Sequence, residues 1–107
     1  MKYGIDIHPT SFTVAFHDEK GKVRTRYFYT NDLEKFKKIL TPDDILAIES
    51  TSNTYWFYDQ LSPYVKEIKV VNTIRFKMIT DASAKTDKLD AKVILEFLEI
   101  GYLPTIR

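Results

Sequence analysis

The sequence contains no cysteine among its 107 residues. This absence excludes disulfide bonds, thiolate zinc sites and cysteine nucleophiles, but it leaves the cellular compartment undecided. A formal net charge of +1 gives the chain no overall basic field, so any affinity for nucleic acid must come from a local patch. No apolar run approaches the roughly 20 residues of a membrane-spanning helix, and no signal peptide opens the chain. We therefore expect a cytoplasmic protein without a membrane partner.

The composition is that of an ordinary folded domain, with 44% apolar and 29% charged residues. A chain of this length suits a single domain that buries roughly two thirds of its unfolded surface. We find no internal repeat and no low-complexity segment. Residues 103–107 lack the character of a tail, so we expect residues 1–107 to be one domain of a longer protein.

The first part of the chain predicts three strands. Residues 3–8 form an apolar run, and residues 11–17 and 23–29 alternate between apolar and polar side chains, as a half-buried strand does. The polar segment 18–22 contains a glycine and suits a hairpin turn. Three consecutive strands with short connections predict an antiparallel meander.

From about residue 30 the pattern changes to helices that alternate with strands. Apolar positions recur at helical spacing, and two of the helices are followed by Pro42 and Pro63 while the last ends at Gly101, a good C-cap. Helices are expected from about residue 30 to 41, from about 54 to 62 and from about 87 to 100, with strands at 45–49 and 67–72.

The second predicted helix, at about residues 54–62, carries an apolar stripe. Tyr55, Tyr58 and Leu61 recur at the spacing of an apolar stripe. We expect the neighbouring Trp56 and Phe57 to belong to the core rather than to a surface on which bases stack.

The order βββαβαβα predicts an α/β fold with a mixed sheet of five strands and helices packed on the sheet. The meander is antiparallel, and the later strands are parallel because they are entered through right-handed crossovers. This is the ribonuclease H-like (RuvC-like) arrangement, in which the first and fourth strands lie side by side.

Four carboxylates stand out in this arrangement. Asp6 interrupts the apolar first strand, and Glu49 closes the fourth strand, so the two could converge. Asp is depleted in strands, and a buried charge without compensation is costly. Asp87 and Asp90 are expected on the first turn of the last helix, where residues at i and i+3 share a face with roughly 5–6 Å between Cβ atoms.

A divalent cation would compensate these charges. Four oxygen donors on fixed elements suit Mg²⁺ or Mn²⁺ rather than zinc. Two such ions, about 3.5–4 Å apart, can activate a water or hydroxyl and stabilise the leaving oxygen at a phosphodiester. The hypothesis is therefore a metal-dependent nuclease in which Asp6, Glu49, Asp87 and Asp90 bind metal and are catalytic.

Each of these residues also has a purely structural interpretation. Asp6 could face water on an edge strand, and Glu49 could be a solvated strand end. Asp87 and Asp90 could serve as an N-cap and an acidic first turn, which the helix dipole favours. His8 shares a face with Asp6 and could contact metal or phosphate, although a partly buried structural histidine is the commoner case.

Basic side chains surround the acidic pair in the sequence and would suit a phosphate backbone. A solvated basic face explains them nearly as well. We select four of them as nucleic-acid-binding candidates and note Lys92 as a fifth cation nearby: Arg75, Lys77, Lys85 and Lys88.

Four short motifs resemble, in order, the motifs of the DEDD transposases of insertion sequence family 110. They are Gly-Ile-Asp-Ile-His at 4–8, Ile-Glu-Ser-Thr at 48–51, Val-Val-Asn at 70–72 and Lys-Thr-Asp-Lys-Leu-Asp-Ala at 85–91. The last is the most specific, and the resemblance covers essentially the whole chain. Two loop positions depart from the family's pattern: Ser52-Asn53 stands where glycine is usual, and Thr73 stands where proline is usual.

The resemblance implies a DNA recombinase whose N-terminal RuvC-like domain carries an Asp-Glu-Asp-Asp metal site. It also implies a separate C-terminal domain with a catalytic serine, a structured guide RNA as a partner, and a homo-oligomer in the full-length protein. Two other functions stay open. One is an actin-like or sugar-kinase ATPase lobe, although His8-Pro9-Thr10 departs from that phosphate-binding hairpin. The other is a non-catalytic module for nucleic-acid binding or dimerisation.

Overall fold

The computed structural model describes residues 1–49, 54–72, 75, 90–101, 103 and 105. Eight helices and strands are found in this part of the chain, with single 3₁₀ turns at Thr30–Asp32 and Ser62–Tyr64. In chain order they are β1 (Lys2–Ile7), β2 (Ser11–His17), β3 (Val23–Tyr29), α1 (Leu33–Lys37), β4 (Ile45–Glu49), α2 (Thr54–Leu61), β5 (Glu67–Val71) and α4 (Ala91–Ile100). Each strand lies within one residue of its predicted bounds.

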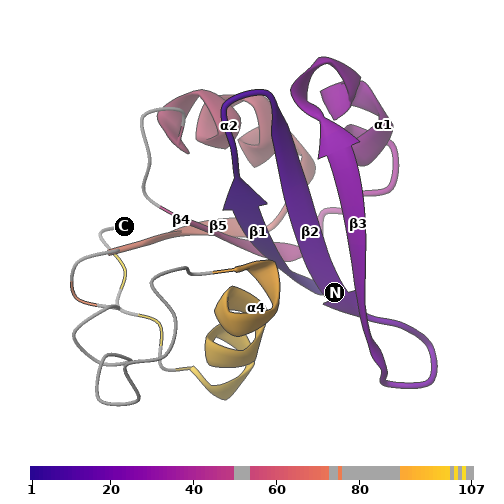
Figure 1. Cartoon of the computed structure of the whole chain (residues 1–107), viewed down its shortest axis with the longest axis vertical. Coiled ribbons are helices and arrows are strands. Elements are labelled where there is room, and N and C mark those ends of the chain that lie inside the picture. The colour runs from indigo at the N-terminus through magenta and orange to yellow at the C-terminus, as the bar shows by residue number, and fades with distance from the viewer. Residues whose placement is uncertain (50–53, 73–74, 76–89, 102, 104, 106–107) are drawn as a thin grey trace.

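The strands form one mixed sheet in the order β3-β2-β1-β4-β5 (Figure 1). β1 pairs antiparallel with β2, and β2 with β3, because short turns join them. β1 and β4 are parallel, as are β4 and β5, because a helix lies between the members of each pair in the chain. The prediction of an α/β fold with a five-stranded mixed sheet is therefore confirmed, and the first strand does lie beside the fourth.

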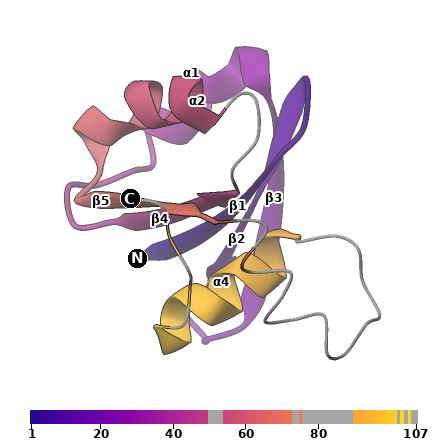
Figure 2. The same ribbon diagram turned by 90° about the vertical axis from the view of Figure 1, so that its left-hand side faces the viewer.

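Helices cover both faces of the sheet (Figure 2). α1 and α2 pack on one face, and α4 packs on the other. Along β1, Tyr3, Ile5 and Ile7 join the hydrophobic cluster beneath α1 and α2. Since side chains alternate along a strand, Gly4 and Asp6 point to the face that α4 covers.

The face under α1 and α2 is held by aromatic packing. Phe12, Phe36 and Phe57 come from a strand and two helices and are almost fully buried. The Phe12 ring lies 5.6 Å from that of Phe36 and 5.3 Å from that of Phe57, and it stacks on Phe28 at 5.2 Å. These contacts lie within the range of favourable ring pairs, so one cluster ties the meander to both helices.

On the opposite face, small residues lie where α4 crosses β1 and β2, which lets the helix approach the sheet closely, while larger apolar residues pack over β4 and β5. Ala15 of β2 packs with Ala91 and Leu95 of α4 in a buried cluster. At Gly4 the helix backbone itself covers the strand: a Cβ built there would lie 2.5 Å from the backbone nitrogen of Leu95 and closer still to the carbonyl oxygen of Ala91. Only a glycine permits this contact.

Three details of the predicted helices are wrong. α4 begins at Ala91, not near residue 87, because Asp90 has an extended backbone and caps the helix. α1 ends at Lys37, so Ile39 lies beyond it and is exposed. α2 buries Thr54, Phe57 and Leu61, whereas Tyr55 and Trp56 are exposed.

The buried face of α2 therefore lies about one position away from the predicted stripe. Phe57 does belong to the core, as expected. Gly101 ends α4 with a φ of 76°, which confirms the predicted C-cap. Among the described residues, we find no helix with the length and apolar character that crossing a bilayer requires.

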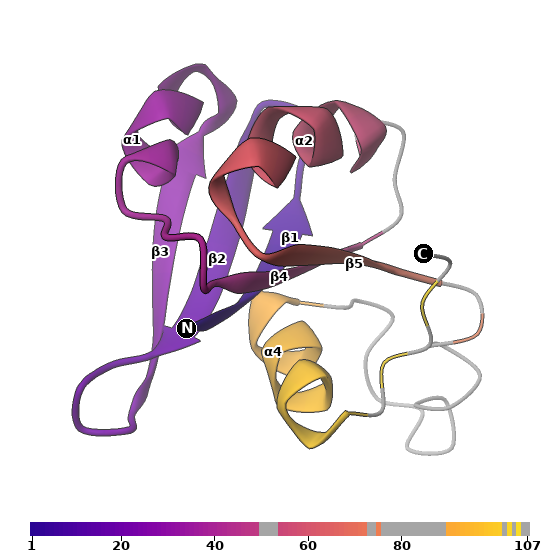
Figure 3. The same ribbon diagram turned by 180° about the vertical axis from the view of Figure 1, so that it is seen from behind.

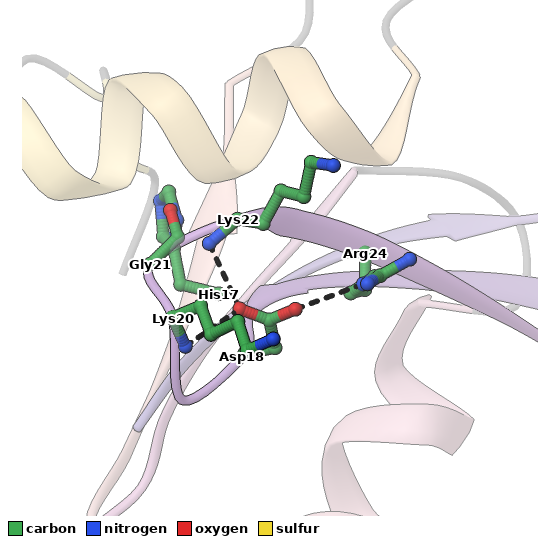
Figure 4. A network of polar contacts seen from close by, with 6 residues as sticks. All are labelled: His17, Asp18, Lys20, Gly21, Lys22 and Arg24. Atoms are coloured by element: carbon green, nitrogen blue, oxygen red, sulfur yellow. Dashed lines mark hydrogen bonds and ion pairs between the residues drawn. The ribbon is translucent and has the colours of Figure 1, made fainter.

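The β2–β3 hairpin extends beyond the rest of the sheet (Figure 3). Asp18 organises its turn, because its carboxylate accepts hydrogen bonds of 2.9 Å from the backbone N–H groups of Lys20 and Lys22 and from the Arg24 guanidinium (Figure 4). The hydrogen bond from Arg24 is the largest cause that lowers the pKa of Asp18. Gly21 supplies the positive φ of 79° that the turn needs.

His17 joins this hairpin to α4. Its Nε2 lies 2.7 Å from a carboxylate oxygen of Glu99, and its Nδ1 lies 2.9 Å from the carbonyl oxygen of Gly21. Both neighbours are acceptors, so the protonated ring, which has two N–H donors, satisfies both. The pKa of His17 is accordingly raised, first by the hydrogen bond to Glu99 and then by that to Gly21.

Gly4→Ala should destabilise the protein, because the added methyl group forces α4 away from the sheet. We expect a loss of about 3 kcal/mol in the free energy of unfolding, at the upper end for an overpacked site. Urea unfolding followed by circular dichroism measures it. Lys2→Ala is the matched control, since Lys2 lies on the same face of β1 but is exposed, and it should change stability by less than about 0.5 kcal/mol. Equal stability of the two variants would contradict the close approach of α4.

His17 should make stability depend on pH. Its pKa in the folded protein is above the ordinary value of 6.5, so its stabilising contribution is complete below pH 6.5 and is lost as pH rises through the folded pKa. We expect the difference in melting temperature between wild type and His17→Gln to shrink over this range. Because both proteins contain His8, any contribution of His8 cancels in this difference. Glu99→Gln should shrink the difference as well, and a difference that is constant with pH would refute the interpretation.

Candidate functional site

Asp6 is a buried carboxylate near the end of a central strand. Only 6% of the residue is exposed, and it lies on the face that α4 covers. The Nε2 atom of His8 lies 3.3 Å from its Oδ2 atom, so His8 is a direct neighbour of this carboxylate. The structural interpretation of Asp6 as a residue on an edge strand is wrong, because β1 is flanked on both sides by other strands.

The register of the two central strands, β1 and β4, sets the position of Glu49 relative to Asp6. Ile5 of β1 pairs with Ile48 of β4, so Asp6 and Glu49 are each one residue beyond the same pair. Residues in register on parallel strands point to the same face, about 4.8 Å apart along the hydrogen-bonding direction. Glu49 is half-buried, and its carbonyl oxygen accepts a 2.6 Å hydrogen bond from the Thr54 hydroxyl, which fixes the start of α2 against the strand end.

Asp90 reaches the same face from the other end of the chain. It is the N-cap of α4, and its Oδ1 accepts a 2.9 Å hydrogen bond from the backbone N–H of Val93. Asp90 therefore has the cap role, whereas the structural interpretation of the sequence placed it in the acidic first turn. A carboxylate has several acceptor positions, so capping leaves it able to bind a cation as well. Asp87, and with it the helix face that it was predicted to share with Asp90, lies outside the described residues; Asp90 itself precedes the helix instead of lying on its first turn.

A pocket of about 240 Å³ joins these elements. Two carboxylates line it, Asp6 from β1 and Asp90 from the start of α4, although 84 positions separate them in the sequence. The remaining polar side chains of its lining are those of His8, Thr13, Thr25 and Lys92. Glu49 is not among the lining residues.

Sequence reasoning missed the two threonines. Thr13 of β2 pairs directly with Asp6 of β1, and Thr25 of β3 pairs with Ala15 of β2. Both positions face α4 because directly paired residues share a face. The alternation of β2 and β3 showed which residues share a face with Thr13 and Thr25. Placing the two threonines beside Asp6 required the register between the strands, which is not evident from the sequence.

The predicted nucleic-acid-binding residues are only partly described. Arg75 is exposed just after β5, and its backbone N–H donates a 3.1 Å hydrogen bond to the side-chain oxygen of Asn72. Lys77, Lys85 and Lys88 lie outside the described residues. Lys92, on the first turn of α4, is the cation that the structure brings to the pocket.

The chemistry of the pocket is that of oxygen ligands. Carboxylates and threonine hydroxyls are hard donors, which Mg²⁺ and Mn²⁺ prefer, whereas zinc favours nitrogen and sulfur. Within the described part of the chain, no group of three or more histidine, aspartate or glutamate side chains is close enough to hold a metal ion. The described residues that carry carboxylate donors here are Asp6 and Asp90 in the pocket and Glu49, which lies beside Asp6 in register.

Comparison with known proteins identifies the family. No curated protein matches the sequence. The sequence model of the DEDD transposases of insertion sequence family 110, whose description is "Transposase", matches residues 3–107. This match covers nearly the whole chain and includes every candidate site residue described above. The protein therefore belongs to the DEDD transposases of insertion sequence family 110.

Proposed function

We propose that this chain is the RuvC-like catalytic domain of a DNA transposase, and that it cleaves and exchanges phosphodiester strands at a carboxylate-bound divalent-metal site. The observation that carries this proposal is the pocket shared by Asp6 and Asp90. Two carboxylates from opposite ends of a family-matched chain meet at one face of the sheet, and one of them is buried at a cost that a cation would offset.

The sheet supports a ribonuclease H-like assignment. An antiparallel meander leads into parallel strands, and the order β3-β2-β1-β4-β5 sets the first strand against the fourth. In this arrangement Asp6 and Glu49 need no loop to bring them together, since the register of two adjacent strands already does so. A site on rigid strands holds its geometry better than one on loops.

The ligand set in this proposal is Asp6, Glu49, Asp87 and Asp90, with Mg²⁺ or Mn²⁺ as the ion. When bound, the metal would polarise the scissile phosphate and lower the pKa of an attacking water or hydroxyl. The chain's own side chains have separate tasks. Burial fixes Asp6, and the cap hydrogen bond fixes Asp90, so neither carboxylate has to be ordered when the substrate arrives.

The cationic and hydroxyl groups of the pocket would orient the substrate. Lys92 can pair with a phosphate oxygen, and the Thr13 and Thr25 hydroxyls can donate hydrogen bonds to it. His8 contacts Asp6 and would help to hold that carboxylate in place. Outside the pocket, the phosphate backbone would be bound by Arg75, Lys77, Lys85 and Lys88.

The remaining parts of the recombinase belong to the same proposal. The domain would form the N-terminal part of a longer homo-oligomeric transposase, with a second domain that supplies a nucleophilic serine and a structured guide RNA that selects the DNA sites. A surface of this size and charge suits non-specific contact with phosphates rather than the reading of a DNA sequence. The family match gives no support to an ATPase lobe or to a module without catalytic activity.

Metal binding should stabilise the folded chain. Mn²⁺ at ten times its Kd should add about 1.4 kcal/mol to the free energy of unfolding, which raises the melting temperature by several degrees. Asp6→Asn should abolish this increase because it removes a ligand charge. The matched control is Asp59→Asn, an exposed aspartate on α2, which should keep it. Melting curves with Mn²⁺ and with EDTA make the measurement, and an equal Mn²⁺ effect in Asp6→Asn and wild type would contradict a site at Asp6.

Each of the four carboxylates should be essential for recombination. In the transposase that carries this domain, Asp6→Ala, Glu49→Ala, Asp87→Ala and Asp90→Asn should each abolish excision of the element in a cell-based assay. Asparagine is used at position 90 because it is a good N-cap, so the charge is lost while the start of α4 is kept. Combined variants should lose no more activity than single ones, since the residues act as a unit.

The control for this assay is Asp59→Ala, which should excise at the wild-type rate. Protein levels measured by immunoblot separate lost catalysis from lost folding. Normal excision by any two of the four variants would refute the catalytic assignment.

A further inference from the structure

Two neighbouring tyrosine rings are exposed at the edge of the sheet. Tyr27 and Tyr29 lie on β3, the edge strand, and are 59% and 60% exposed, whereas Phe28 between them is buried in the core. Their ring centroids are 5.4 Å apart and their planes are nearly perpendicular, at 87°. Single exposed apolar residues are common, but two large rings in contact on an open strand form a surface that is suited to binding.

The register of the meander connects these rings to the acidic pocket. Asp6 pairs with Thr13, and Thr13 pairs with Tyr27, so the three side chains form one row across the face that α4 covers. A second row runs beside it: the backbone N–H of His8 donates to the carbonyl oxygen of Ser11, and Ser11 pairs with Tyr29. Two strand spacings, about 10 Å along the sheet, separate the backbone positions of Asp6 and Tyr27.

We propose that Tyr27 and Tyr29 form a stacking surface for unpaired bases of a nucleic-acid strand whose phosphate lies at the acidic pocket. Aromatic rings stack with bases of any sequence, but bases in a duplex are already stacked on each other, so the partner is single-stranded. The choice of nucleic acid rests on the proposed function, because strand exchange releases nucleotides from a duplex. The two perpendicular rings offer surfaces of different orientation, which suits a strand that turns as it leaves the pocket.

The charge of β3 favours this partner over a second copy of the chain. Arg26 directly precedes Tyr27 and points to the opposite face of the strand, where its guanidinium lies 4.9 Å from the centroid of the Phe28 ring, whereas Arg24 is paired with Asp18. An antiparallel pairing of the β3 edges of two copies in register at Arg26 would place the two Arg26 side chains opposite each other on one face, which is unfavourable. The Arg26 guanidinium can attract the phosphates of a strand that follows the sheet edge.

The test measures binding of a fluorescein-labelled single-stranded DNA oligonucleotide to the 107-residue chain by fluorescence anisotropy, in EDTA and at low salt. Tyr27→Ala and Tyr29→Ala should each weaken binding about 5-fold or more, the effect of losing one stacked base. Tyr27→Phe and Tyr29→Phe should restore it, because phenylalanine keeps the ring. Tyr64→Ala is the matched control: Tyr64 is an exposed tyrosine in the 3₁₀ turn after α2, and its loss should leave binding unchanged.

Three results would overturn the proposal. They are unchanged binding in the alanine variants, an equal loss with duplex DNA of the same sequence, and a wild-type dimer in light scattering that Tyr27→Ala and Tyr29→Ala convert to monomer. The assay contains no metal, so its failure is distinct from that of the metal site. The alanine variants should also melt cooperatively near the wild-type temperature without metal, which checks that they fold.

Discussion

The close contact between α4 and β1 at Gly4 is the constraint on which the candidate site depends. The backbone of Ala91 and Leu95 occupies the space that any side chain at position 4 would fill. Asp90 directly precedes Ala91, and Asp6 lies two residues from Gly4 on the same face of β1. The contact at Gly4 therefore holds the start of α4 where the carboxylates of Asp90 and Asp6 line the same pocket. A larger residue at position 4 would move the start of α4, and the two carboxylates would separate.

The two faces of the sheet divide the work of stability and function. Aromatic rings fill the side under α1 and α2, where burial of large apolar groups contributes most of the stability. On the side under α4, the helix lies closer to the sheet, with alanine and glycine near the middle of the contact and polar side chains at one end. A buried aspartate is unfavourable for folding, and the aromatic side of the sheet offsets that cost. In the proposed site, this cost is what gives the pocket its affinity for a cation.

Much of this could be predicted from the sequence, and the failures have physical causes. Alternation located β2 and β3, and apolar runs located β1 and β4; topology then related Asp6 to Glu49, because register is fixed wherever a strand has a buried face. The start of α4 was misplaced because aspartate is favoured both as an N-cap and in the first turn of a helix, so the residue type alone does not show where the helix begins. The stripe of α2 was misplaced because eight residues make barely two turns, so Phe57 with Leu61 and Tyr55 with Tyr58 fit a helical period equally well. Thr13 and Thr25 needed the register across three strands.

The electrostatics of the pocket link its two proposed ligands. A phosphodiester is an anion, and Asp6 and Asp90 repel it; Lys92 and the positive end of the α4 dipole oppose this repulsion only in part. In the proposed site, a bound cation reverses the sign of the field, so metal and phosphate bind better together than either does alone. Affinity for nucleic acid without metal must therefore come from outside the pocket. Uncharged aromatic rings meet that need, because stacking is insensitive to the acidic field, and Tyr27 and Tyr29 lie in the same rows of the sheet as Asp6 and His8.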